Sequence, residues 1–127
     1  KEGWVLISRT GTVGNVVRIN KSMDGVFIDD HMIRVKPEKQ YAGLIYIYLK
    51  SFFGQKLIEF QKYGSVQEVI NSEYIERIPI PQKLIKEDIL KQFNTKVNDA
   101  SNKIDNADIM EKKAIDLIEK EIESWQK

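Results

Sequence analysis

The chain has no cysteine, only three prolines and a single histidine among its 127 residues. Without cysteine it has neither a disulfide framework nor a thiolate zinc site. His31 has no second histidine to complete a metal site and no evident nucleophile to activate. We therefore expect no metal, no cofactor and no catalytic residue in this chain.

Long apolar runs are missing as well, because no stretch approaches the roughly 18 residues that suggest a membrane-spanning helix. A signal-peptide pattern is also absent. Both absences favour a cytoplasmic protein that makes no contact with a membrane.

Charge is nearly balanced, with 20 Lys and Arg against 19 Asp and Glu. Residues 1–82 carry a net charge of +2, and residues 83–127 carry a net charge of −1. A domain that binds nucleic acid is usually more basic than this. The composition by itself therefore slightly favours a protein-binding role.

The first part of the chain predicts a small antiparallel or mixed sheet. Four apolar segments rich in β-branched residues are typical of strands, namely residues 4–7, 13–19, 26–28 and 32–35. Asp29 and Asp30 lie between the last two, where a divalent cation is one interpretation. Adjacent strand residues point to opposite faces, however, so an ordinary β-turn explains the pair better.

Residues 41–62 have the period of a helix. The apolar stripe of this segment consists of Ile45, Leu49, Phe53, Leu57 and Phe60, widened by Phe52. We interpret these side chains, the aromatic ones included, as part of the core. Gly64 then predicts the end of the helix.

Residues 63–82 join two different parts of the chain. Residues 78–81 should be extended, on a sheet edge or outside the sheet, because prolines disfavour the helical region before them and cannot donate to a ladder. From about Lys86 the pattern predicts a helix of roughly 40 residues, about 60 Å long. The chain thus reads as α+β, with a small β domain and a packed helix in residues 1–82 and one long helix of coiled-coil type in residues 83–127.

The long helix has a narrow apolar seam, and such a seam needs a partner helix. The spacing of eleven residues from Ile104 to Ile115 interrupts the pattern of the seam as a coiled-coil stutter does. The predicted interface residues are Leu90, Phe93, Val97, Ile104, Ile115, Ile118, Ile122 and Trp125.

Four segments, taken in order, resemble one family. They are residues 7–14 (Ile-Ser-Arg-Thr-Gly-Thr-Val-Gly), residues 46–51 with Gly54-Gln55, residues 63–82 (with Gly-Ser-Val-Gln, Ile-Asn and Ile-Pro-Ile-Pro), and residues 83–127. Together they are similar to the target-recognition domain and spacer helix of a type I restriction–modification specificity subunit. That subunit has two of each and an opening segment that this chain lacks, so the chain reads as a fragment or half-subunit.

The resemblance implies a non-catalytic module that reads one half of a bipartite site in double-stranded DNA. The implied partners are DNA adenine methyltransferase subunits, docked through the long helix, and the restriction subunit of the complex. The methyltransferase subunits would carry the methyl donor and flip the target base out of the duplex. We expect the isolated fragment to pair with a second copy through its seam.

Two polar clusters are candidates for touching DNA. In the turn after the first strand, glycines let backbone approach phosphate, and an arginine can bind a guanine edge bidentately. In the second cluster, a glutamine can read adenine while a lysine and a serine hold phosphate. The candidate residues are Arg9, Thr10, Thr12, Asn15, Lys21, Ser22, Lys56, Lys62, Tyr63, Ser65 and Gln67.

Simpler interpretations remain open for each cluster and for the whole chain. Without the family resemblance, a plain glycine-containing hairpin is the better interpretation of the turn. A solvated loop explains the second cluster as well as a DNA contact does. A coiled-coil assembly adaptor without nucleic-acid binding is the main alternative function. A recognition domain from a single-chain restriction–methylation enzyme is a third.

Overall fold

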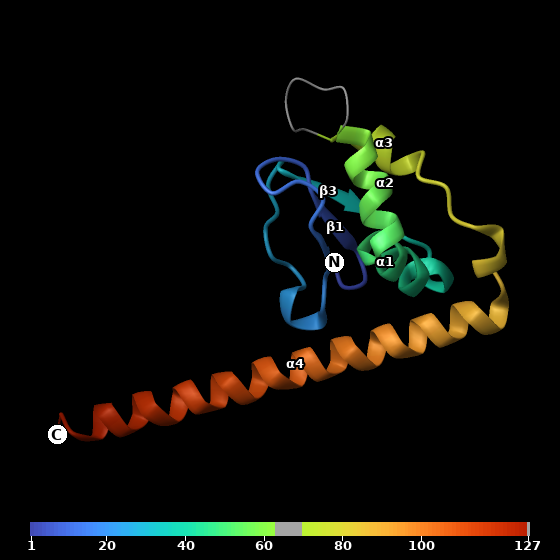
Figure 1. Cartoon of the computed structure of the whole chain (residues 1–127). Helices are drawn as coiled ribbons and strands as arrows, with labels where there is room; N and C mark the ends of the chain where they lie inside the picture. The colour runs from blue at the N-terminus through green and yellow to red at the C-terminus, as the bar shows by residue number, and fades with distance from the viewer. Residues whose placement is uncertain (63–69, 127) are drawn as a thin grey trace.

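The computed structural model describes residues 1–62 and 70–126, and these form a small head from which one long helix extends (Figure 1). The head contains a sheet and the helices α1 (Ala42–Lys50) and α2 (Phe52–Lys62), while α4 (Glu87–Ser124) passes beneath it and continues beyond it. The predicted α+β class is therefore confirmed. None of the described helices combines the length and apolar composition that crossing a membrane requires.

A three-stranded antiparallel sheet forms the centre of the head, in the order β2-β1-β3. The strands are β1 (Val5–Ser8), β2 (Val16–Arg18) and β3 (Met32–Val35). In β1 the three consecutive residues Val5, Leu6 and Ile7 are all buried. Because successive strand residues point to opposite faces, both faces of this strand are covered.

The sheet is smaller than the sequence predicts. Residues 26–28 form no strand, and Val26 and Phe27 are exposed, so that prediction is wrong. The second strand begins only at Val16, because the turn before it runs on to Asn15 through Gly14, whose φ of +90° is incompatible with a strand. Residues 30 and 31 form a turn, as expected.

The single helix predicted over residues 41–62 is two helices, α1 (Ala42–Lys50) and α2 (Phe52–Lys62), preceded by the 3-10 helix η2 (Lys39–Tyr41). Ser51 separates them with an extended ψ of 163°. Its hydroxyl donates to the Tyr48 carbonyl at 2.6 Å and accepts the Gly54 N–H at 3.2 Å, which starts the second helix. Glycine is required there, since a Cβ on Gly54 would lie 1.9 Å from the Tyr48 carbonyl oxygen.

This break changes which side chains of the second helix are buried. Ile58 is 1% exposed, whereas Phe52, Phe53 and Phe60 are 70%, 71% and 72% exposed. The prediction that these aromatic side chains belong to the core is therefore wrong. The core is largely aliphatic and consists of Val5, Ile7, Val13, Val16, Ile33, Leu49, Ile58, Ile70 and Ile78.

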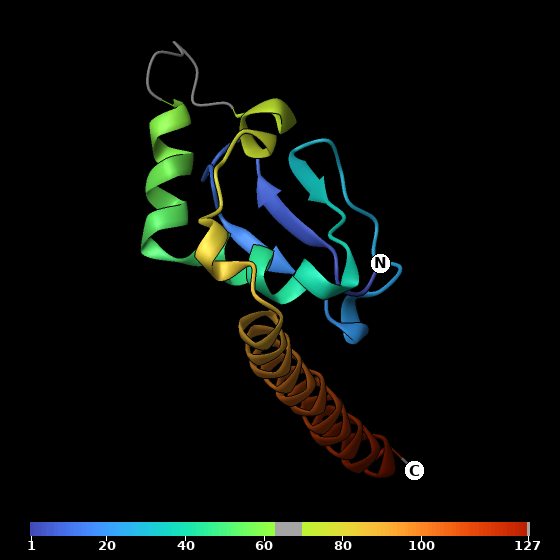
Figure 2. The same cartoon turned by 90° about the vertical axis from the view of Figure 1, so that its right-hand side faces the viewer.

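The C-terminal part begins with the short helix α3 (Ser72–Glu76), capped by the side chain of Asn71. Residues 78–81 then run extended outside the sheet, as predicted, with the Tyr48 hydroxyl donating to the Pro79 carbonyl at 2.8 Å. The 3-10 helix η3 (Gln82–Leu84) leads into α4 (Glu87–Ser124). This 38-residue helix confirms the long helix expected from about Lys86. Figure 2 shows α2 beside the sheet and α4 leaving the head on the side away from the end of α2.

The first half of α4 is docked on the head by polar contacts around one buried apolar side chain, Val97. Asn94 contacts the start of α1, where its Oδ1 accepts the Gly43 N–H at 2.8 Å. Arg18 on β2 donates to Ser101 at 2.6 Å and to Asn98 at 3.1 Å. The division into domains after residue 82 stays a prediction.

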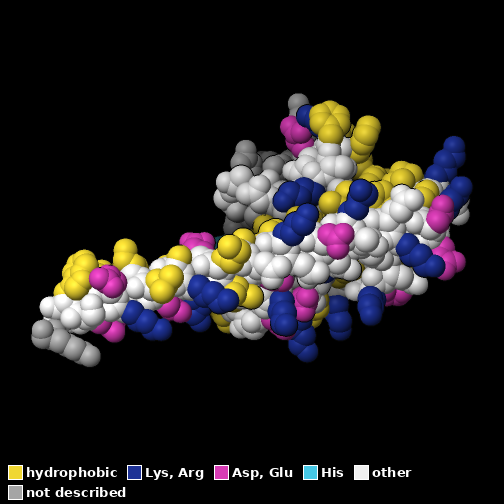
Figure 3. Space-filling view, turned by 90° about the horizontal axis from the view of Figure 1, so that it is seen from below, with side chains coloured by type: hydrophobic (Ala, Val, Ile, Leu, Met, Phe, Trp, Pro, Cys, Tyr) yellow, Lys and Arg dark blue, Asp and Glu magenta, His cyan; other side chains and the backbone are white. Residues whose placement is uncertain are grey.

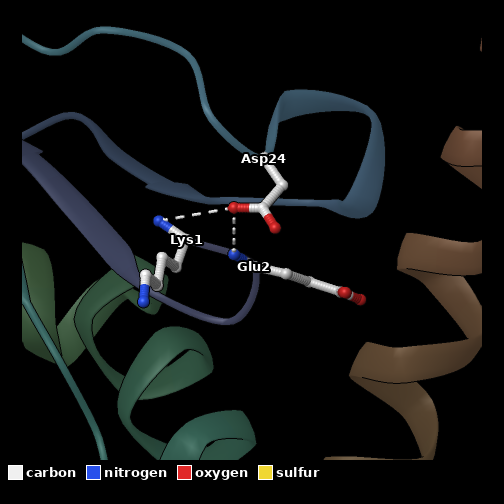
Figure 4. Close-up of polar contacts among 3 residues, drawn as sticks. All are labelled: Lys1, Glu2 and Asp24. Carbon is white, nitrogen blue, oxygen red and sulfur yellow. Dashed lines mark hydrogen bonds and ion pairs between the residues drawn. The ribbon is translucent and has the colours of Figure 1, made fainter.

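The 3-10 helix η1 (Lys21–Met23) extends this docked surface. Ser22 donates its backbone N–H to Asp105 at 3.1 Å and its hydroxyl to Asp108 at 2.9 Å. The N–H of Ser22 lowers the pKa of the Asp105 carboxyl below its ordinary value. Beside η1, Asp24 accepts the Glu2 N–H at 3.2 Å, which ties the start of the chain to the same region (Figure 4).

Candidate nucleic-acid interface

One end of the sheet gathers several loops. Because both neighbours of β1 run antiparallel to it, the end of β1 lies beside the starts of β2 and β3. The turn of residues 9–15 and the segment 28–31 therefore meet at this end. Ile70 joins them by donating its N–H to the Arg9 carbonyl at 3.4 Å. This end lies opposite the side of the head on which α4 docks (Figure 1).

Ser8 holds the turn from within. Its backbone N–H donates to the Asn15 carbonyl at 2.9 Å, and its carbonyl accepts the Gly14 N–H at 2.9 Å. Its hydroxyl donates to the Thr12 carbonyl and accepts the Asn15 N–H at 2.9 Å. These bonds use backbone groups of the turn, and Thr12 and Asn15 remain exposed.

Gly14 fixes the same turn to the helices behind it. Gln55 on α2 donates its side-chain amide to the carbonyls of Gly14 at 3.0 Å and Leu49 at 2.8 Å. A Cβ on Gly14 would come within 3.0 Å of the Ile58 side chain. The turn is thus anchored on the core, which limits its freedom to rearrange when a ligand binds.

Arg9 and Thr10 lie where the turn meets segment 28–31. The Arg9 N–H donates to the His31 carbonyl at 2.8 Å, while the Arg9 residue is exposed. The Thr10 hydroxyl lies 2.8 Å from Nδ1 of His31. An exposed guanidinium on a fixed backbone is suited to a bidentate contact with a guanine edge or a phosphate.

The structure brings together only part of the predicted DNA-binding set. The turn contains Arg9, Thr10, Thr12 and Asn15. Lys21 and Ser22 belong to η1 at the other end of the sheet, where Ser22 bonds to α4. The ammonium group of Lys56 pairs with Glu59 at 3.1 Å. Lys62 is the last residue of α2, and Tyr63, Ser65 and Gln67 lie outside the described residues.

Two residues of this site are missed by sequence reasoning. Gln55 anchors the turn, and His31 contacts two of its residues. Their partners are 41 and 21 residues away in the chain, so no local pattern reveals the contacts.

The predicted helix interface falls into two parts. Near the start of α4, Val97 is buried against the head, and Leu90 and Phe93 are half-buried. The remaining members are 43–70% exposed, and they are Ile104, Ile115, Ile118, Ile122 and Trp125. We call the part of α4 beyond Asp108, its last described contact with the head, the free half. Figure 3 shows hydrophobic side chains distributed between charged ones along it.

An open apolar groove of about 780 Å³ lies between α1, α2 and the start of α4. Phe53, Phe60 and Phe93 contribute aromatic rings to its wall, and Lys56 and Lys83 are its charged members. Phe53 and Phe60 of α2 therefore line a surface groove rather than fill the core.

Comparison with known proteins adds one finding. A family model described as a type I restriction modification DNA specificity domain matches residues 1–120. No curated protein and no solved structure matched the chain. The matched range includes the whole head and most of α4.

Proposed function

The chain belongs to the family of type I restriction modification DNA specificity domains, and we propose that its head reads one half of a bipartite site in double-stranded DNA. The observation that carries this proposal is the turn of residues 9–15, which presents exposed polar side chains on a backbone fixed from behind. Membership of the specificity family supports a role in the recognition of DNA.

The turn offers the chemistry that recognition needs. Arg9 can donate two hydrogen bonds to O6 and N7 of a guanine, and Thr12 and Asn15 can contact neighbouring base edges or phosphates. The carbonyl of Gly14 is occupied by Gln55, so the backbone stays in place while side chains adapt to the bases. Lys62, the last residue of α2, is our candidate for a phosphate contact.

The free half of α4 is proposed to serve assembly. Its exposed isoleucines lie beyond the head, where a second spacer helix can cover them. In the complete system we propose that methyltransferase subunits dock on this helix pair and that the restriction subunit joins them. When this chain is alone, we propose that the free half of α4 pairs with that of a second copy. An antiparallel two-fold arrangement would use the same surface on both copies.

A second candidate function, assembly without DNA binding, is favoured by the apolar groove and by the nearly neutral head. DNA binding and its dependence on salt distinguish the two. A recognition module releases counterions when it binds, so the logarithm of its affinity falls linearly with the logarithm of the salt concentration. An adaptor has no such dependence.

The test measures fluorescence anisotropy of labelled duplexes at several salt concentrations, after selection of preferred sequences from a randomised pool. Arg9→Ala should relax the sequence preference at a cost of about 1–3 kcal/mol, and Lys62→Ala should reduce the salt slope by about one. Lys112→Ala, a change on the free half of α4, is the matched control and should leave both quantities unchanged. Binding without salt dependence, or no binding, would contradict DNA recognition by this chain.

A further inference from the structure

His31 lies against the turn that the proposed function assigns to DNA. Its carbonyl accepts the Arg9 N–H at 2.8 Å, and its ring nitrogen Nδ1 lies 2.8 Å from the Thr10 hydroxyl. Two consecutive turn residues are therefore bonded to one residue of segment 28–31. The bond to Thr10 is the one that a substitution at His31 can remove.

His31 is itself held in place. Its N–H donates to Oδ1 of Asp29 at 3.0 Å, which closes the turn before β3. The Arg34 guanidinium donates to the Ile28 carbonyl at 2.5 Å and so braces the same segment from within β3. Because segment 28–31 is held against β3, the His31 ring gives the Thr10 hydroxyl a partner in a fixed position.

We propose that His31 is a positioning residue for DNA recognition, which fixes the Thr10 hydroxyl and through it the direction in which the Arg9 side chain leaves the turn. This inference rests on the proposed function. The bonds of Ser8 and Gln55 hold residues 12–15 of the turn, whereas Gly11, which has a φ of +70°, gives the chain little stiffness directly after Thr10. A hydrogen bond at Thr10 therefore selects among arrangements of the turn that Gly11 leaves accessible.

The bond forms with either neutral tautomer of the ring. The Thr10 hydroxyl donates when Nδ1 is unprotonated and accepts when Nδ1 carries a proton. Loss of one hydrogen bond of this kind changes the balance between two arrangements by about threefold to tenfold. We expect base discrimination to change by the same factor, because only one arrangement presents Arg9 correctly.

The experiment measures the affinities of the full chain for its selected duplex and for duplexes with single base changes. His31→Ala and Thr10→Val should each lower discrimination by about threefold to tenfold at the bases that Arg9→Ala also affects. The salt slope should not change, because no phosphate contact is lost. His31→Gln, whose amide can bond to Thr10, should restore part of the discrimination, and Asp30→Asn, at the exposed neighbour, should leave it intact.

A double substitution separates positioning from simple destabilisation. If His31 acts through Arg9, then Arg9→Ala with His31→Ala should discriminate no worse than Arg9→Ala alone. Unchanged discrimination in both His31→Ala and Thr10→Val would overturn the inference while leaving DNA recognition standing. Absence of salt-dependent duplex binding by the unaltered chain would overturn both. Thermal melting identifies a variant that fails to fold, and Thr10→Val then decides the question by itself.

Discussion

The backbone N–H of Gly43 donates a 2.8 Å hydrogen bond to Oδ1 of Asn94, which lies 51 residues later in the chain. Gly43 is in the first turn of α1, where helix N–H groups lack partners within the helix. The N-cap residue Tyr41 makes no capping bond with its side chain, so a side chain from α4 supplies the cap. The long helix is therefore part of how the head folds.

Gly43→Ala should destabilise the protein. A Cβ at this position would lie 2.6 Å from the Asn94 side-chain oxygen and 2.8 Å from its backbone nitrogen, so α4 must move. Overpacking of this kind costs about 1–3 kcal/mol. Asn94→Ala removes the cap and also the bond from its Nδ2 to the Gln40 carbonyl, and should cost about 1–2 kcal/mol. Urea denaturation measures both, with Asn102→Ala on the exposed side of α4 as control. A Gly43→Ala variant as stable as the parent would contradict the close contact.

The contact between η1 and α4 predicts a dependence of stability on acid. The Ser22 N–H lowers the pKa of Asp105 in the folded state, so the carboxylate contributes stability that is fully present above the unfolded-state pKa. This contribution is lost as the pH falls below about 4 and passes through the folded-state pKa. Asp105→Asn should therefore bring the melting temperatures at pH 6 and pH 3 closer together. The same difference in parent and variant would argue against the bond.

Substitution of two nearby residues of α2 should lower the stability of the protein by very different amounts. Ile58→Ala should cost about 2–5 kcal/mol, because the side chain is 1% exposed within the core. Phe60→Ala should change stability by no more than about 0.5 kcal/mol, because the ring is 72% exposed. Chemical denaturation of the two variants gives the comparison. A large loss at Phe60 would restore the sequence-based view of this ring as core.

The free half of α4 should associate with a second copy. Ile118→Asp should yield monomers with little change in the head, since Ile118 is 61% exposed and lies far from the docked contacts. Val97→Asp should instead destabilise the head, because Val97 is 4% exposed against it. Sedimentation of the parent chain at tens of micromolar decides the matter. A clean monomer there contradicts self-association.

Local patterns in the sequence predict the elements whose neighbours are near in the chain. Strands β1 and β3 and the long helix follow from runs of apolar residues and from their spacing. The break at Ser51 escapes this reasoning, because an apolar stripe continues across it and only the bond to Tyr48 reveals it. As a result, the burial of Phe53 is predicted wrongly.

The sequence predicts the position of the candidate site but not the contacts that hold it. The family resemblance and the glycines locate the turn of residues 9–15, because turn chemistry is local. The roles of Gln55 and His31 depend on packing between distant segments, and no spacing rule contains that information. The engagement of Ser22 with Asp108, 86 residues away, is equally invisible in the sequence.

The most direct test of the account lengthens α4 and reads the DNA target. Four residues inserted between Met110 and Glu111 lie beyond Asp108, so the docked contacts of the head are kept. The helix grows by about 6 Å and its seam drifts by only about 40°, which a coiled coil absorbs as a stutter.

Mapping of methylated sites in cells that carry a complete restriction–modification system with this chain is the measurement. DNA advances about 3.4 Å per base pair, so the two halves of the methylated target should lie one or two base pairs further apart. Their own sequences should stay the same. Lys112→Ala, which keeps the length of α4, should leave the spacing as it was. An unchanged spacing in the lengthened protein would contradict the view that the head reads one half-site and α4 sets its distance from the other.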